Sequence, residues 1–230
     1  MVHADFMSCL YELVVHLFSV PLHEELGVVK LQVCSVKGSI LPKSREEILK
    51  KAEAINATHV LFLDSDMTFP KELLHRWLYL GYPIVAANCV LRKIPTSTTA
   101  RVIKNHDDLT QHFAVITTKD KANKGLVDRV DMVGTGIMLI EMAAIKDIPK
   151  PRFPITWNDK LQDYVGEDWN FGLLLAKHGI PMMVDHKVSW EVGHLGQFKH
   201  THALVSLEQE VTKAQQQAKE EREGLSSKEN

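Results

Sequence analysis

The chain has 230 residues, of which 45% are hydrophobic and 24% charged. This composition is typical of a soluble globular protein with one large domain or two small ones, and the net charge of −2 gives no electrostatic reason to expect nucleic acid or a membrane surface as a partner. No apolar stretch approaches the ~20 residues that a membrane-spanning helix needs, and the first residues lack the basic flank of a signal peptide. The three cysteines are scattered without metal-ligand spacing, so we expect a protein of the reducing cytoplasm.

The N-terminal part of the chain predicts two helices with a strand between them. Apolar residues recur at helical spacing over residues 6–18, and residues 28–36 alternate enough to predict a strand. A second helix is expected over residues 44–55, with Ser44 as its N-cap and a glutamate three residues on that completes a capping box. Arg45 would then lie in the first turn, where the macrodipole disfavours a cation. It is either solvated or held there to meet a phosphate or a base, and the sequence leaves both open.

The stretch around which the rest is organised begins with the apolar residues 60–63 and continues into Asp64, Ser65 and Asp66. A short apolar run is typical of a strand buried on both faces of a parallel sheet, and ligand sites lie at the carboxyl ends of such strands. Residues i and i+2 share a face, so both carboxylates would point to one side, where a divalent metal carrying a phosphate is their natural partner. The alternative is an ordinary turn in which Asp66 or Thr68 caps the next helix.

Strand and helix alternate through the middle of the chain. A helix is expected over residues 71–80 and a buried strand over residues 84–87, the rhythm of a parallel α/β sheet. Residues 93–125 lose that pattern and predict a hairpin excursion or a mobile loop, with an edge strand at residues 113–116.

A Gly-x-Gly motif lies inside the apolar stretch of residues 131–140. Glycines within a strand mark a bulge or the close approach of another group. Gly134, Thr135 and Gly136 are therefore a plain bulge, or room for a bound sugar, or both. The third glycine and the following helix of a dinucleotide-binding fingerprint are missing, and we exclude that function.

Two further motifs follow in the C-terminal half. Gly166 precedes Glu167 and Asp168, which open a predicted helix. Acidic residues at a helix start are favoured by the dipole alone, so Asp168 has a structural explanation as well as a functional one. After a short strand at residues 182–184, His194 stands between glycines, which favours a ligand or loop role, although a lone histidine is more often structural.

Taken in order, these motifs resemble those of nucleotide-sugar glycosyltransferases of the GT-A fold, especially the family-2-like enzymes of phages and bacteria. The matching elements are a Ser-Arg pair, an Asp-x-Asp after an apolar strand, a Gly-Thr-Gly, a Gly-Glu-Asp-Trp and a Gly-His-Leu-Gly, at residues 44–45, 61–66, 134–136, 166–169 and 193–196. The resemblance covers most of the chain and implies an α/β fold with a Rossmann-like, mixed but mostly parallel sheet between helices. We expect one such domain over residues 1–203 and a charged, helical to disordered tail over residues 204–230.

The resemblance also implies a role for each matched residue. Asp64 would touch the ribose or the metal, Asp66 would coordinate Mn²⁺ or Mg²⁺ on the diphosphate, and His194 would complete the metal shell. Arg45 would contact the nucleotide, and Asp168, or otherwise Glu167, would be the general base for an acceptor hydroxyl. The remaining residues of the two donor-binding motifs are Ser65, Gly134, Thr135 and Gly136.

The activity implied is transfer of a sugar from a UDP- or GDP-linked donor to a glycan, protein or small-molecule hydroxyl, with inversion if the displacement is direct. The string from Asp64 to Thr68 also resembles the Asp-x-Asp-x-Thr motif of haloacid-dehalogenase-like phosphatases, in which Asp64 would be the nucleophile and Mg²⁺ the cofactor. A third alternative is a GT-A-like protein that binds sugar or nucleotide without turnover.

Enzymes of the GT-A type begin with an apolar strand whose end helps to hold the nucleotide base. This sequence goes straight into a predicted helix, so we expect a sheet that lacks its first strand, unless residues 28–36 or another segment fill the position. A missing strand would leave unpaired backbone groups on its neighbour.

Overall fold

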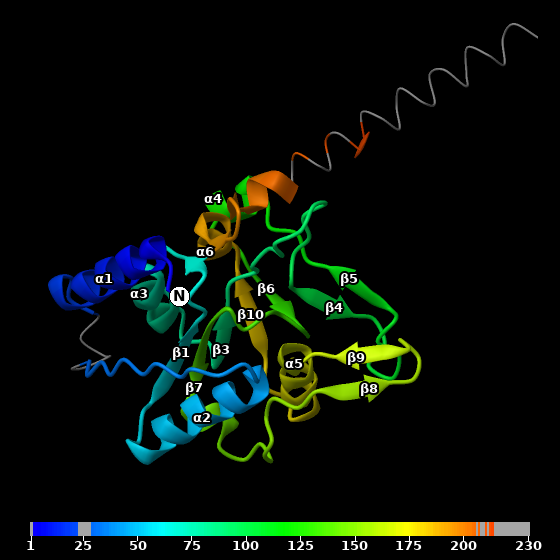
Figure 1. Cartoon of the computed structure of the whole chain (residues 1–230), viewed down its shortest axis with the longest axis horizontal. Helices are drawn as coiled ribbons and strands as arrows, with labels where there is room; N and C mark the ends of the chain where they lie inside the picture. The colour runs from blue at the N-terminus through cyan, green and yellow to red at the C-terminus, as the bar shows by residue number, and fades with distance from the viewer. Residues whose placement is uncertain (1, 23–28, 206, 208–209, 211, 214–230) are drawn as a thin grey trace, which may run out of the picture.

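A five-stranded mixed sheet forms the centre of the computed structural model, which describes residues 2–22, 29–205, 207, 210 and 212–213. The strands lie in the order β1 (His59–Leu63), β7 (Ile137–Glu141), β3 (Ile84–Ala86), β10 (Met182–Asp185) and β6 (Val127–Val130) (Figure 1). Strands β1, β3 and β10 run in one direction, while β7 and β6 run in the other. The expected α/β class is confirmed as a mixed sheet between helices, but the prediction of a mostly parallel sheet is wrong, because among the described strands only β3 and β10 pair in parallel.

Helices cover both faces of this sheet because neighbouring residues of each strand point to opposite sides. In β7, Met138 and Ile140 pack with α2 (Leu41–Ala54) and α5 (Glu167–Lys177). The alternate residues Ile137 and Leu139 pack on the other face, with α1 (Ala4–Ser19), α3 (Leu73–Leu80) and α6 (His186–Glu191). The predicted helices around residues 6–18, 71–80 and 167–178 are confirmed.

Shorter strands extend the molecule beyond the central sheet. The hairpin of β4 (Arg101–Ile103) and β5 (His112–Ala114) is the excursion expected between residues 93 and 125, and a second hairpin pairs β8 (Thr156–Asn158) with β9 (Asp163–Val165). Both hairpins lie on the side of the molecule where α5 begins (Figure 1). A small sheet joins β2 (Met67–Thr68), β11 (Gly193–Leu195) and β12 (Lys199–His200). The remaining short helices are α4 (Lys119–Asn123) and the 3-10 helix η2 (Met142–Ile145).

Two strand predictions are wrong. Residues 29–36 form no strand, and the first residue of that predicted strand, Val28, lies outside the described residues. Leu31 and Val33 are exposed, so the alternation there reflects no buried face. Strand β1 lies at the edge of the sheet and pairs antiparallel with β7, rather than inside a parallel sheet. Within the described residues, the other edge of β1 has no partner strand.

Two local predictions also need correction. Helix α2 begins at Leu41 with Pro42 in its first turn, so Ser44 lies inside the helix and caps nothing. The Gly-Thr-Gly motif precedes β7 instead of forming a bulge in it, because the strand begins at Ile137. The carbonyl of Gly136 accepts the amide of Asp64 at 2.8 Å and so ties the end of β1 to the start of β7.

The tail predicted over residues 204–230 falls mostly outside the described residues. Within the part of the chain that is described, no helix combines the length and apolar character needed to cross a membrane.

Candidate functional site

The turn that follows β1 presents the two aspartates of the Asp-x-Asp motif. Both lie beyond the last strand residue, Leu63, so they belong to a turn and not to one face of a strand as predicted. The amide of Met67 donates to the carbonyl of Asp64 at 3.1 Å and closes this turn. Leu63 pairs with the first residue of β7, so the turn lies at the carboxyl ends of the parallel strands, where the sequence places the site.

His194 lies beside Asp66 because β11 pairs with β2. His194 is opposite Met67 in this small sheet, and its Nε2 lies 3.5 Å from Oδ2 of Asp66. The other ring nitrogen, Nδ1, donates to the carbonyl of Val90 at 2.8 Å, which directs Nε2 toward the carboxylate. On the same oxygen of Asp66, Nη1 of Arg92 lies at 3.1 Å. His194 is therefore in a strand and not in a loop, and it is oriented by a backbone carbonyl.

The two side chains of this pair shift each other's pKa. Burial alone lowers the pKa of His194, but its contacts with Asp66 and the Val90 carbonyl outweigh burial and raise the pKa overall. The same contact with His194 holds the pKa of Asp66 below its usual value, with a further contribution from Arg92. Asp66 is thus a carboxylate surrounded by positive and hydrogen-bonding groups.

Arg45 connects α2, the Asp-x-Asp turn and α5. It is buried, pairs with Glu167, and places Nη2 at 3.9 Å from Oδ2 of Asp64. Burial raises the pKa of Asp64, Arg45 opposes this, and the neighbouring charge of Asp66 adds to the increase. Arg45 is therefore not solvated, and the alternative that it meets a phosphate or a base stays a prediction.

Glu167 and Asp168 are adjacent in sequence but differ in environment. The Glu167 carboxylate is taken by Arg45, whereas Oδ1 of Asp168 accepts the amide of Trp169 at 2.8 Å. Burial raises the pKa of Asp168, and the nearby charge of Glu167 raises it further. We refer to the residues that converge here as the central cluster, which consists of Arg45, Asp64, Asp66, Arg92, Glu167, Asp168 and His194.

The Gly-Thr-Gly motif packs against this cluster. A Cβ atom at Gly136 would lie 3.4 Å from Oδ2 of Asp64, and one at Gly134 would lie 3.3 Å from Thr99. Between them, Thr135 is buried, and its Oγ1 has no hydrogen-bond partner within the described residues. Ser65 is exposed at the tip of the turn. The glycines therefore leave room for Asp64 and Thr99.

Sequence reasoning missed Arg92 and the carbonyl of Val90. Both follow strand β3, in a stretch without a recognisable motif. Their position just after a predicted buried strand is the signal that was available, because the ends of parallel strands meet at one edge of a sheet. Cys89 lies in the same stretch, and burial raises the pKa of its thiol, so it is an inert neighbour of the two aspartates.

The predicted metal site is only partly assembled in the structure. Among the described residues, no three His, Cys, Asp or Glu side chains are arranged to hold a metal ion. Asp66 and His194 nevertheless supply an oxygen and a nitrogen donor at neighbouring positions, and a ligating histidine is usually held through its other nitrogen as His194 is. Asp64 faces Arg45 instead. Two of the three predicted metal ligands, Asp66 and His194, are therefore neighbours in the structure, and the third, Asp64, is directed elsewhere.

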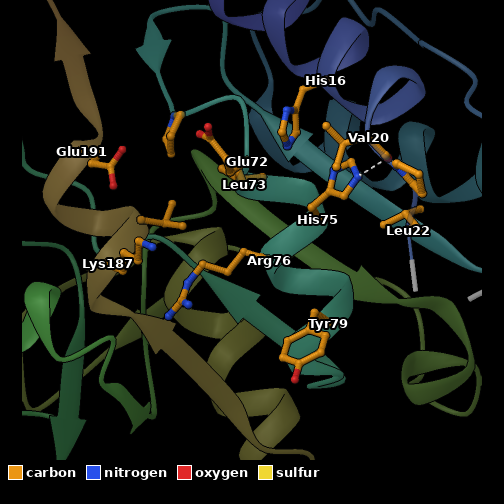
Figure 2. A pocket seen from close by; sticks show the side chains of 13 residues that line it. His16, Val20, Leu22, Glu72, Leu73, His75, Arg76, Tyr79, Lys187 and Glu191 are labelled. Carbon is orange, nitrogen blue, oxygen red and sulfur yellow. Dashed lines mark hydrogen bonds between the residues drawn. The ribbon is translucent and has the colours of Figure 1, made fainter. Parts of the chain in front are cut away.

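A larger cavity of about 710 Å³ lies elsewhere, between the end of α1, helix α3 and helix α6 (Figure 2). None of the predicted site residues lines it. Two of its polar side chains are engaged within the fold, since Arg76 pairs with Asp185 and His75 donates to the carbonyl of Val20. These contacts stabilise the helix packing and leave the central cluster as the candidate site.

Comparison with known proteins adds little to this geometry. No protein-family model matches the chain, and no curated protein matches it. Among solved structures, the chain is similar to the one titled "Crystal Structure of A197 from STIV", with 16% identity, 70% of each chain covered and a TM-score of 0.45. We therefore argue function from the central cluster itself.

Proposed function

We propose that this protein is a metal-dependent glycosyltransferase of the GT-A type, which moves a sugar from a nucleoside-diphosphate donor to an acceptor hydroxyl. The observation that carries the proposal is the contact of Asp66 with His194 and Arg92, which brings together three segments that are far apart in sequence. A carboxylate and an imidazole can ligate a divalent metal, and a guanidinium can pair with the phosphates that the metal carries.

The donor side of the reaction is assigned to the turn after β1. Asp66 and His194 would hold Mn²⁺ or Mg²⁺, which when bound neutralises charge on the leaving diphosphate. Arg92 carries its guanidinium half exposed beside Asp66, where it can pair with a phosphate oxygen. Exposed Ser65, and Asp64 once released from Arg45, can hydrogen-bond the ribose or the diphosphate.

The acceptor side is assigned to Asp168. A general base works best when its pKa lies near the operating pH, and burial together with Glu167 raises the pKa of Asp168 in that direction. Glu167 is the weaker candidate because its carboxylate is paired with Arg45. The Asp168 carboxylate would take the proton of the acceptor hydroxyl as that oxygen attacks the anomeric carbon and the nucleoside diphosphate leaves. Direct displacement of this kind inverts the anomeric centre.

The first prediction tests the donor site by thermal shift with UDP and GDP, each with and without Mn²⁺. A nucleotide that binds the folded state raises the free energy of unfolding by about 2.7 kcal/mol at a hundredfold excess over Kd. We expect Asp66→Ala and His194→Ala to lose the Mn²⁺-dependent shift. The matched controls Asp120→Ala and His178→Ala, at exposed positions outside the central cluster, should keep it.

An assay of released products separates the alternative functions. Release of UDP or GDP from nucleotide sugars supports the transferase, and release of inorganic phosphate from generic phosphoesters would instead support a phosphatase with Asp64 as nucleophile. Nucleotide or sugar binding without turnover would indicate a binding protein. If His194→Ala binds Mn²⁺ and nucleotide as tightly as the parent chain, the shared metal site is wrong.

A further inference from the structure

A second cavity, of about 380 Å³, lies next to the central cluster on the side of Asp168. It is formed where hairpin β8–β9 meets β5 and the first turn of α5, and Figure 1 shows these elements on one side of the molecule. Its volume lies within the range of small-ligand sites. Three of its lining residues, Gly166, Asp168 and Trp169, belong to the Gly-Glu-Asp-Trp motif of the sequence, whereas the residues from β5 and hairpin β8–β9 belong to no recognised motif.

Aromatic rings form much of its wall. Trp169 lies partly buried at the start of α5, with its ring edge-to-face against His112 at 5.3 Å between centroids. Tyr164 of β9 lines the same cavity and is 67% exposed, although it packs edge-to-face against Trp157 on the neighbouring strand. An exposed aromatic ring held in place by another ring is a surface on which the apolar face of a ligand can stack.

The polar groups of the wall are acceptors rather than cations. The carboxylates of Asp163 and Asp168 line the cavity, and each uses Oδ1 to accept a backbone amide, at 2.7 Å and 2.8 Å. His112 Nδ1 donates to the carbonyl of Leu109 at 2.7 Å, so Nε2 is the ring nitrogen that this contact leaves free for a ligand. No lysine or arginine is among the described residues that line the cavity.

We propose that this cavity binds a neutral carbohydrate, which serves as the acceptor in the transfer proposed above. A sugar ring has apolar faces that stack on aromatic rings and hydroxyl groups that donate to carboxylates, and both partners are present. Two carboxylates without a lining cation disfavour phosphorylated or acidic ligands by charge repulsion. Because Asp168 lines the cavity and also belongs to the central cluster, a bound sugar hydroxyl lies next to the proposed base. This inference rests on the proposed function for the role of acceptor, but not for carbohydrate binding itself.

The second prediction is tested by saturation-transfer NMR on the full chain without nucleotide or metal. The probes are maltose, cellobiose, lactose and N,N′-diacetylchitobiose, and we expect at least one of them to bind. Tyr164→Ala and Asp163→Asn should weaken its binding at least tenfold. Tyr11→Ala, which changes an equally exposed tyrosine on α1, should have no effect. Trp169→Phe should retain binding, and Trp169→Leu should lose it.

Three outcomes would overturn the inference. They are the failure of all four disaccharides to bind, full binding by Tyr164→Ala and Asp163→Asn, and tighter binding of glucose 1-phosphate than of glucose. Failure of the proposed function is separate, because it would appear as absence of Mn²⁺-dependent nucleotide binding. Sugar binding at this cavity without any nucleotide binding would leave the carbohydrate site in place and remove the transferase.

Discussion

The adjacent carboxylates Glu167 and Asp168 lie in one turn of helix but have two different environments. Glu167 faces Arg45 and completes a buried ion pair between α5 and α2. Asp168 faces the smaller cavity, and burial next to Glu167 raises its pKa. Removing the charge of either residue should therefore produce a different defect.

The third prediction concerns Asp168→Asn. This change keeps the size of the side chain and its acceptor for the Trp169 amide, but it removes the basic oxygen. Transfer should fall at least ~10²-fold, the low end for loss of a general base, and donor affinity should stay within about twofold. Steady-state kinetics together with nucleotide titration would measure both quantities.

The comparison variant is Glu167→Gln. It removes the carboxylate that pairs with buried Arg45 and leaves only Asp64 as a charged neighbour, at 3.9 Å from Nη2, so stability should fall by about 3 kcal/mol, measured by chemical unfolding. If Glu167→Gln lowers transfer as strongly as Asp168→Asn while stability is unchanged, the general base is Glu167 and the assignment is reversed.

Helix α5 is positioned at the scale of the element by a glycine. A Cβ atom at Gly172 would lie only 2.2 Å from the backbone carbonyl oxygen of Asp131, so the helix approaches the chain before β7 more closely than any other residue permits. Asp131 also accepts the amide of Ile103 at 2.7 Å and thereby fixes hairpin β4–β5. The close approach of Gly172 to Asp131 therefore sets the distance between α5 and hairpin β4–β5, and with it the position of the wall that α5 contributes to the smaller cavity.

The fourth prediction is that Gly172→Ala destabilises the protein although alanine favours helices. The backbone must shift to fit the methyl group, which costs about 1–3 kcal/mol. Replacing glycine by alanine gains about 1 kcal/mol in helix propensity, so the upper part of that cost outweighs the gain. Thermal unfolding should show a lower Tm, and disaccharide binding should weaken because the cavity wall moves. Lys177→Ala, at an exposed position of the same helix, should change neither. An unchanged or higher Tm for Gly172→Ala would contradict the close approach.

At the scale of the whole molecule, Asn88 links distant segments. Its side-chain nitrogen Nδ2 donates to the carbonyl of Val115 at 2.7 Å, and its side-chain oxygen Oδ1 accepts the backbone amide of Ala100 at 2.9 Å. Its backbone amide donates to the hydroxyl of Ser189. Its carbonyl accepts a hydrogen bond from buried His202, which brings the segment after β12 back onto the end of β3. A change of charge at His202 should therefore change the stability of the folded chain.

The fifth prediction follows from burial, which lowers the pKa of His202 to about 4, against about 6.5 in an unfolded chain. Between these values the unfolded state binds a proton that the folded state does not, so stability falls as the pH decreases from 6.5 to 4. The loss approaches about 3 kcal/mol for this one group. Urea unfolding at pH 7 and pH 4.5 should show a smaller loss for His202→Gln than for the parent chain. Equal losses in the two proteins would show that His202 is accessible to protons in the folded state.

The sequence by itself determined the elements whose pattern is local. Helix α1 was predictable from apolar residues at helical spacing, and α3 and α5 from the glycines that follow them, because these signals are properties of one segment. The same holds for the Asp-x-Asp turn at a strand end, the start of α5 and the glycine-flanked histidine, because residue type and order suffice to recognise them.

Only the tertiary structure decided how these segments meet. Strand β1 became an antiparallel neighbour of β7 because sheet order depends on backbone pairing between distant segments, which no local apolar pattern encodes. The pairing of Arg45 with Glu167, and the contacts of Asp66 with Arg92 and His194, arise in the same way, because they join elements that only the packing of the sheet and helices brings together. The environments that distinguish Asp168 from Glu167 therefore exist only in the folded chain.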